Sequence, residues 1–300
     1  MANAKEVLAS MRSIQDTMKI TNAMFLISSA KLRKAKKRLS AVSDYFHTMQ
    51  HTIHEVLESM PELEHVFLRS PAAPPPRKKA LLVVTADKGL AGGYNQSVIR
   101  MAEDQLAQCP DTRLYVLGQV GRRYFSRKTT QVDQAFSYTA QEPNLQRARR
   151  IASEMINHYQ EESLDEVSVI FTEMVTPLTA EAKLLKLLPL DRRDFEESAL
   201  ETAIPAITEF YPSPAAVLSQ VVPIYMHGIL FGALTESYCA ELHARMTAMD
   251  AATKNGSEML QDLQLLYHRS RQAAITQEIT EVSSGAKAFR QKKTKKGESV

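Results

Sequence analysis

The sequence has little of several things that most soluble enzymes use. Its 300 residues include no tryptophan, 7% aromatic residues and two cysteines. Scarce aromatic side chains favour long helices over a thick globular core. Cys109 and Cys239 lie far apart and match no metal-binding or redox spacing, so we expect two plain buried thiols in a reducing compartment and no metal site.

Targeting and membrane signals are also missing. No apolar run approaches the ~18 residues that a membrane span needs. The N-terminus lacks the apolar stretch of a secretion signal. We therefore expect a cytosolic chain, which could still dock on a membrane assembly.

Glycine is scarce, and its two short clusters do not fit a nucleotide site. Residues 89–93 read GLAGG and follow a predicted strand, where a phosphate loop would lie. The cluster lacks the Gly-Lys-Ser/Thr ending of a P-loop and the Gly-x-Gly-x-x-Gly dinucleotide pattern, as does GQVG at 118–121. We expect tight turns here and no bound cofactor.

The N-terminal residues carry a seven-residue repeat of apolar positions. Steps of four and three from Val7 reach apolar residues up to Val56, and only Thr21 and Ser28 are polar. No proline or glycine interrupts the repeat before Pro61. The pattern predicts one strand of a left-handed coiled coil over residues 1–60.

The C-terminal residues carry a weaker version of the same repeat, over residues 209–288. From Val217 the steps pass through Gly228, Thr235, Arg245 and Gly256, and small residues there would let two helices approach closely. A proline at 223 is expected to kink the helix or mark its start. This helix is the longer of the two, so it should extend beyond its antiparallel partner.

The middle of the chain has a different sequence pattern from the two ends. A Pro-rich linker is expected at 61–77. Residues 78–208 then alternate predicted strands with predicted helices, which indicates a Rossmann-like, doubly wound α/β domain. The strands are expected at 80–85, 114–117, 132–138 and 167–171, and the helices at 95–108 and 145–159. A basic, disordered tail is expected at 289–300.

The strongest electrostatic feature is the run KLRKAKKR at 31–38. Three interpretations stay open: a solvated helix face, a nucleic-acid surface, or a contact with an acidic protein segment. The net charge of +3 is too small to indicate nucleic-acid binding by itself.

Several motifs together resemble the gamma subunit of F-type ATP synthase, of the bacterial type. They are SIQDTMKITNAM at 13–24, AKLRKA at 30–35, TADKGLAGGYN at 85–95, ARMTAMDAATKN at 244–255 and SRQAAITQEITE at 270–281. The resemblance covers nearly the whole chain. It implies a non-catalytic central-stalk rotor at the cytoplasmic face of the cell membrane, where ion-driven rotation of a c ring is coupled to ATP synthesis or hydrolysis. The implied partners are the alpha and beta subunits, the epsilon subunit and the c-subunit ring.

The resemblance also implies four sets of partner-binding residues. The expected catch for a loop of the beta subunit is Arg271, Gln272, Thr276 and Glu278. The residues expected to face an acidic lever of beta are Lys31, Arg33, Lys34 and Lys36. Arg245 and Met24 are expected to affect coupling, and Phe210 and Tyr211 to contact the c ring.

Two other classes of function remain as alternatives at this point. One is a coiled-coil scaffold that binds nucleic acid through residues 31–38, which would show a steep salt dependence. The other is a small α/β nucleotide enzyme with helical arms, which would bind ATP as a lone chain.

Overall fold

The computed structural model shows two compact units. One unit comprises Met1–Leu26 and Met249–Val300, and the other comprises Ile27–Ala248. The structure describes residues 4–69, 78–128, 132–161, 164–176, 179–195 and 210–297, and leaves the side chains of 4, 41–47 and 288–297 undescribed. Residues 70–77 of the expected linker and all of 196–209 lie outside the described residues.

Two long helices run through both units, as the heptad pattern predicts. Helix α1 is Ala4–Ser59 and helix α5 is Pro214–Gly297. Proline in the first turn fits a helix start, because its missing N–H has no acceptor there. Ser213 caps this end, since its Oγ accepts a hydrogen bond from the N–H of Ala216 at 3.2 Å. The expectation that Pro223 marks the start is wrong, because that proline lies inside α5.

A four-stranded mixed sheet forms the centre of the second unit. The strands are β1 Lys79–Val84, β2 Thr112–Leu117, β3 Glu166–Met174 and β4 Ala180–Leu188, in the order β2-β1-β3-β4. The pairs β1–β2 and β1–β3 are parallel, and β4 runs antiparallel to β3. The other elements are α2 Tyr94–Gln108, α3 Gln119–Phe125, α4 Leu145–Glu161 and a 3-10 turn at Arg192–Phe195.

The strand expected at 132–138 does not form. Only a single parallel bridge joins Val132 to Leu114. The Asp133 carboxylate explains why, because its Oδ1 accepts hydrogen bonds from the N–H groups of Ala135 and Phe136 and turns the backbone away. Arg113 of β2 pairs with the same carboxylate at 2.7 Å.

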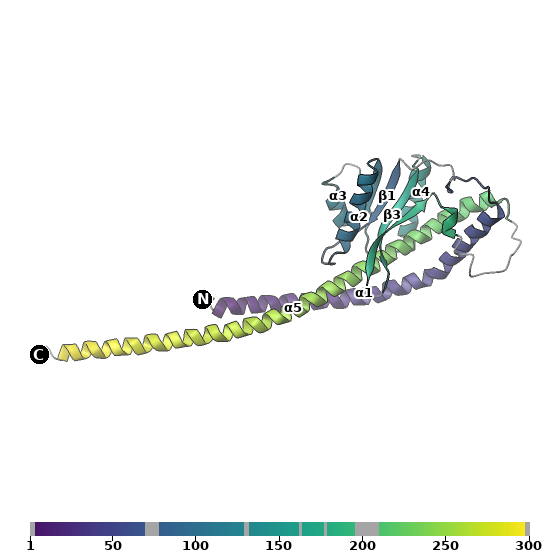
Figure 1. Ribbon diagram of the computed structural model, residues 1–300. Coiled ribbons are helices and arrows are strands. Elements are labelled where there is room, and N and C mark those ends of the chain that lie inside the picture. Colours follow the sequence, from purple (N-terminus) through teal and green to yellow (C-terminus); the bar gives the residue numbers. More distant parts are fainter. Residues whose placement is uncertain are drawn as a thin grey trace. The chain divides into compact units, whose positions relative to one another are not determined.

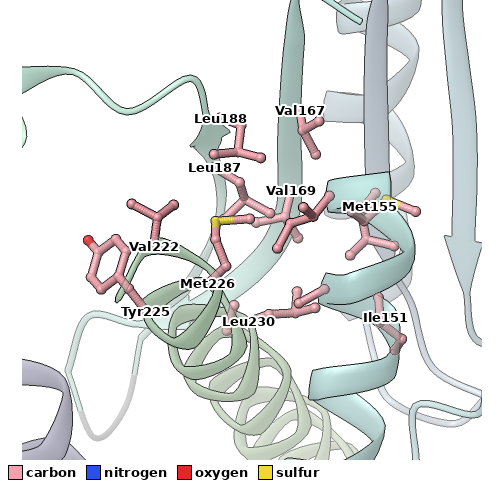
Figure 2. Close-up of a cluster of buried hydrophobic side chains, with 14 of the residues drawn as sticks. Ile151, Met155, Val167, Val169, Leu187, Leu188, Val222, Tyr225, Met226 and Leu230 are labelled. Carbon is pink, nitrogen blue, oxygen red and sulfur yellow. The ribbon is translucent and has the colours of Figure 1, made fainter. Parts of the chain in front are cut away.

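Helices cover both faces of the sheet, which confirms the layered α/β arrangement (Figure 1). Helix α2 packs on one face through Val98, Ile99 and Ala102, against Leu81 and Val83 of β1. The other face belongs to the largest buried cluster, which Figure 2 shows in part. Its labelled members are Ile151 and Met155 of α4, Val167 and Val169 of β3, Leu187 and Leu188 of β4, and Val222, Tyr225, Met226 and Leu230 of α5.

A large part of each long helix belongs to this second unit, which differs from the expected division of the chain. The C-terminal end of α1 adds Ile53, Val56 and Leu57 to the large cluster. Further along, Leu32 and Ala35 of α1 pack against α5. A boundary between an isolated coiled coil and an α/β domain at residue 78 or 208 does not match these contacts. The first residues of the expected linker are packed too, since Phe67 and Leu68 are buried.

The apolar composition of α5 has a structural explanation. Among the described residues, this is the one helix that is long and apolar enough to cross a membrane, with a window of mean hydropathy 1.6. The expectation that no apolar run is long enough to span a membrane is therefore wrong, as judged by the length and composition of this helix. Half of that window is buried inside the protein, and the start of α5 supplies Leu218, Val222 and Met226 to the core. Sheet packing accounts for this hydrophobicity.

In the first unit, the two helices pair along the predicted inward positions of α1. Val7 and Thr21 are buried, and Met11, Ile14 and Met18 between them are half-buried. The polar residue at 21 does not break the packing, because its hydroxyl lies 2.7 Å from the hydroxyl of Thr253 on α5. A polar pair inside the contact fixes the register of the two helices.

The predicted inward positions of α5 are half right in this unit. Met249, Gly256 and Leu263 face inward as expected. The intervening positions are wrong by one residue, since Thr253 and Leu260 are half-buried while Ala252 and Met259 are exposed. Alternating steps of three and four can be placed in either order, and here the order lets Thr253 meet Thr21. Gly256 lies close to α1, where a Cβ would stand 2.8 Å from Cγ of Met18.

Replacing Thr21 by valine tests the hydroxyl pair. We expect the free energy of unfolding to fall by about 0.5–1.5 kcal/mol, and the double change with Thr253→Val to cost no more than the single change. Each hydroxyl also lies within hydrogen-bond distance of a carbonyl of its own helix, which can accept the proton of a hydroxyl that has lost its partner, so little is left unsatisfied. Urea unfolding followed by circular dichroism measures this, with Thr17→Val on the exposed face as the control. Additive losses in the double variant would contradict the pairing.

Helix α5 extends beyond its pairing with α1, as the helix lengths require. Ser270 is its last half-buried residue, and every described side chain from 271 to 287 is exposed. The tail expected to be disordered from 289 continues as helix through Gly297, and only 298–300 lie outside the described residues. Alanine, lysine, arginine and glutamine favour helix, and basic residues suit a helix C-terminus.

Candidate functional sites: a buried joint and an exposed helix surface

The glycine-rich turn after β1 is held by hydrogen bonds from several elements of the second unit. The Ala86 N–H donates to Oδ1 of Asn95 at 2.9 Å. The Asp87 carboxylate accepts from the N–H of Gln119 at 3.1 Å and from the N–H of Ala140 at 3.0 Å. It also accepts from the Thr139 hydroxyl. The turn is therefore a fixed structural feature, as the sequence predicts.

A buried ion pair of α5 packs on this turn. Nη1 of Arg245 lies 2.7 Å from Oε1 of Glu241, and these side chains are 10% and 3% exposed. Nη2 of Arg245 donates to the carbonyls of Lys88 at 3.3 Å and Gly89 at 3.1 Å. Burial raises the pKa of the Glu241 carboxyl, and Arg245 opposes that shift by favouring the charged form.

A second set of contacts joins the sheet to α5 one turn earlier. The Tyr94 hydroxyl, at the start of α2, lies 2.8 Å from Oγ of Ser237, and the Thr172 N–H of β3 donates to the same Oγ at 3.2 Å. Burial raises the pKa of Tyr94, so the phenol stays neutral. Ala86, Ala91 and Ala240 form a small apolar cluster around these bonds.

We call these contacts the sheet–α5 joint: Glu241, Arg245, the carbonyls of Lys88 and Gly89, and the Tyr94–Ser237–Thr172 bonds. The joint lies at the carboxyl end of the parallel strands, where doubly wound domains bind their ligands. Here α5 occupies that position. The turn presents carbonyl oxygens to a guanidinium, which is the wrong polarity for a phosphate cradle of N–H groups. Among the described residues, no group of three or more His, Cys, Asp or Glu side chains could hold a metal ion.

The basic run of α1 is mostly a free surface, with one internal contact. Arg33, Lys34 and Lys36 are exposed. Lys31 is half-buried, and its ammonium lies 3.1 Å from Oε1 of Glu142, just before α4. The hydrogen bond from Lys31 lowers the pKa of Glu142. Three of the four expected lever residues are therefore open to a partner, and the fourth already has an acidic neighbour.

The expected catch residues all lie on the exposed part of α5. Arg271, Gln272, Thr276 and Glu278 are exposed, in the stretch beyond the last half-buried residue. The Thr276 hydroxyl donates to the carbonyl of Gln272 at 2.9 Å, one turn earlier. Gln272 and Thr276 share one face of the helix, four residues apart, whereas Glu278 lies two turns after Arg271 on a neighbouring face.

The remaining expected residues are not gathered into one site. Phe210 packs against the large buried cluster, whereas its neighbour Tyr211 is 92% exposed. Met24 belongs to the first unit, and the described contacts of Arg245 lie in the second. A coupling role for Met24 and Arg245 as a pair stays a prediction.

Sequence reasoning missed Glu241, Tyr94 and Ser237. The spacing of Glu241 and Arg245 by four residues was a usable signal, because such pairs face each other on a helix. The contact of Tyr94 with Ser237 joins residues 143 apart in sequence, and no local pattern indicates it.

Comparisons with known proteins agree with the fold and with the motifs. A family model described as ATP synthase matches residues 3–289. The ATP synthase gamma chain of Acetivibrio thermocellus is 39% identical over 295 residues, which is 97% of this chain and 100% of that one. The sodium ion specific gamma chain of Acetobacterium woodii is 31% identical over 301 residues, covering 96% and 99%.

Solved structures are similar in fold at lower identity. The central stalk and c-ring structure of the Tetrahymena thermophila mitochondrial ATP synthase contains a chain with a TM-score of 0.60 and 23% identity, covering 78% of this chain and 99% of that one. A chain of the Euglena gracilis mitochondrial enzyme has a TM-score of 0.55 and 13% identity, covering 89% and 95%.

Proposed function

The chain belongs to the ATP synthase gamma family, and we propose that it acts as a rotor that couples ion-driven rotation of a membrane c ring to ATP turnover at catalytic beta subunits. As a gamma chain it is a non-catalytic stalk subunit of the membrane-associated ATP synthase. We place it at the cytoplasmic face of a bacterial cell membrane, held there through the c ring.

One observation in this chain supports the proposal most directly. Helix α5 presents seventeen consecutive exposed side chains, from 271 to 287, beyond the part paired with α1. Exposed apolar residues in that stretch include Ile275, Ile279 and Val282. An isolated helix of this kind is marginal in water, so it needs a surrounding partner. A ring of alpha and beta subunits would supply such a surface.

The charged residues suggest how each partner would be recognised. Arg271 and Gln272 would catch a loop of beta near the exposed end of α5. Arg33, Lys34 and Lys36 would face acidic lever segments of beta, where complementary charge steers a contact more than it strengthens it. We assign Tyr211 to a contact with the c ring, and the epsilon subunit to the α/β unit.

Co-purification tests the function as a whole. Tagged full-length chain expressed in its native host should recover alpha, beta and epsilon subunits together with c subunits in mild detergent. Purification of the chain without alpha and beta would sink the rotor proposal.

Replacing Arg271 by alanine tests the catch. We expect coupled ATP synthesis in reconstituted vesicles to fall about tenfold, because a charge-assisted hydrogen bond to a partner is lost. Stability should change by less than about 0.5 kcal/mol, since Arg271 is exposed and has no role in the core. Arg269→Ala, two residues earlier and also exposed, is the matched control. Equal synthesis by the two variants would contradict the assigned contact.

A further inference from the structure

The sheet–α5 joint has directional, buried bonds at a place where apolar packing alone would hold a helix. We propose that Glu241 positions Arg245 in this joint, and that the joint carries torque between the α/β sheet and α5. This inference rests on the proposed rotor function and names the residues of this chain through which the force passes.

The two guanidinium edges of Arg245 have separate roles. Nη1 is held by the Glu241 carboxylate at 2.7 Å, and Nη2 reaches the carbonyls of Lys88 and Gly89 at 3.3 and 3.1 Å. A guanidinium is planar, so fixing one edge orients the other. Because Glu241 is almost fully buried and its carboxylate has no proton to donate to the carbonyls of the turn, it acts through Arg245 as a positioning residue.

The spacing of the joint residues explains why the joint would resist rotation of α5. Ser237, Glu241 and Arg245 recur every four residues, so they lie along one face of the helix. They contact three different parts of the sheet layer: the β1–α2 turn, the first turn of α2 at Tyr94, and β3 at Thr172. Apolar contacts between alanines permit sliding, whereas hydrogen bonds lose strength steeply when distance or angle changes.

A simpler interpretation is that Glu241 and Arg245 only stabilise helix α5. Pairs four residues apart do stabilise helices, by about 0.2–0.5 kcal/mol when exposed. The two interpretations differ in what an exchange of charges would do. Exchange by Glu241→Arg with Arg245→Glu restores the pair within the helix. It also places a carboxylate against two carbonyl oxygens, so it cannot restore the contact with the turn.

The experiment compares three forms of the assembled ATP synthase. They are Glu241→Gln, the charge exchange, and the control Glu258→Gln, which removes an exposed carboxylate of the same helix. The first measurement is amide hydrogen exchange in residues 86–93. We expect amide hydrogen exchange to be about tenfold faster in Glu241→Gln and in the double variant with exchanged charges. The control should show no change. The second is the ratio of ion transport to ATP hydrolysis in vesicles, which should fall about twofold or more in the same two forms.

Each result decides between the interpretations. Faster exchange in the turn with a lower transport ratio supports the proposal. Faster exchange with an unchanged ratio means that the joint is structural only, and overturns the torque assignment while leaving the rotor function intact. The positioning role is overturned if amide hydrogen exchange is unchanged in Glu241→Gln. It is also overturned if the double variant with exchanged charges behaves like the natural protein. If the charge exchange does not assemble, the isosteric Glu241→Gln form still decides. Hydrogen exchange does not depend on rotation, so its failure is distinct from failure of co-purification.

Discussion

Replacing Gly118 by alanine is expected to lower the free energy of unfolding by at least about 3 kcal/mol, enough to prevent assembly of most of the protein. Gly118 follows β2 with φ of +93°, a conformation that side chains rarely adopt. A Cβ there would also overlap the backbone carbonyl of Thr85, with its carbon only 2.7 Å away. Backbone cannot move aside as a flexible side chain can, so both penalties remain. Urea unfolding of the purified chain, or its loss from the soluble fraction, measures the effect.

Gly89→Ala is the matched control for this change. Gly89 lies in the neighbouring turn, and a Cβ there would meet no atom within 4 Å. We expect its free energy of unfolding to stay within about 0.5 kcal/mol of that of the natural protein. Equal stability of the two variants would show that the close approach of Gly118 to Thr85 is not as tight as described.

Replacing Leu230 by alanine is the second change with a large expected effect. Leu230 is 0% exposed and lies in the cluster that joins α4, the sheet and α5 (Figure 2). Removing its branched end leaves a cavity between a sheet and helices that cannot all close around it. The expected loss is about 2–5 kcal/mol of unfolding free energy.

Thermal or urea unfolding measures the loss, with Leu145→Ala as the control in the same unit. Leu145 is 52% exposed at the start of α4, and alanine is a good helix former, so its replacement should be nearly neutral. Similar losses in both variants would mean that α5 does not pack on the sheet as described.

Much of the helical part of the fold could be predicted because its apolar repeat continues over many residues. The inward positions of α1 appear in the sequence as an apolar repeat, and the polar exceptions Thr21 and Ser28 are buried in the same positions. The one-residue error in α5 has a physical cause. Ala252 and Thr253 are both small, and only contact with the partner helix determines which one faces inward.

The sheet could be predicted where a strand is buried on both faces. Continuous apolar runs at β1 and β3 predicted the buried parallel strands of the sheet. Strand β4 was missed because its sequence, AEAKLLKLL, consists of helix-forming residues and is largely exposed along its first part. Tertiary pairing with β3 decided its structure.

The candidate sites divide in the same way. The basic run and the motif around Arg271 are contiguous in sequence, so they were visible, although their partners remain proposals. The sheet–α5 joint was not visible, since it brings together a turn near residue 88, a strand end near 172 and a helix near 241. Arg245 was visible as a charge in an apolar repeat and, through the family resemblance, as a coupling residue. Its buried position makes sense only with Glu241 and the two carbonyls in place.

The contact of Arg245 with the turn after β1 also bears on what could compete for it. In a separate molecule, a guanidinium binding two carbonyls would associate only weakly. Here it is attached to a helix that already packs beside the turn, so its effective concentration is set by the fold and is unaffected by dilution. A dissolved cation would have to compete with a guanidinium that stays tethered beside the turn. The carbonyl oxygens of Lys88 and Gly89 are in that sense a binding site that is filled by a side chain of the same protein.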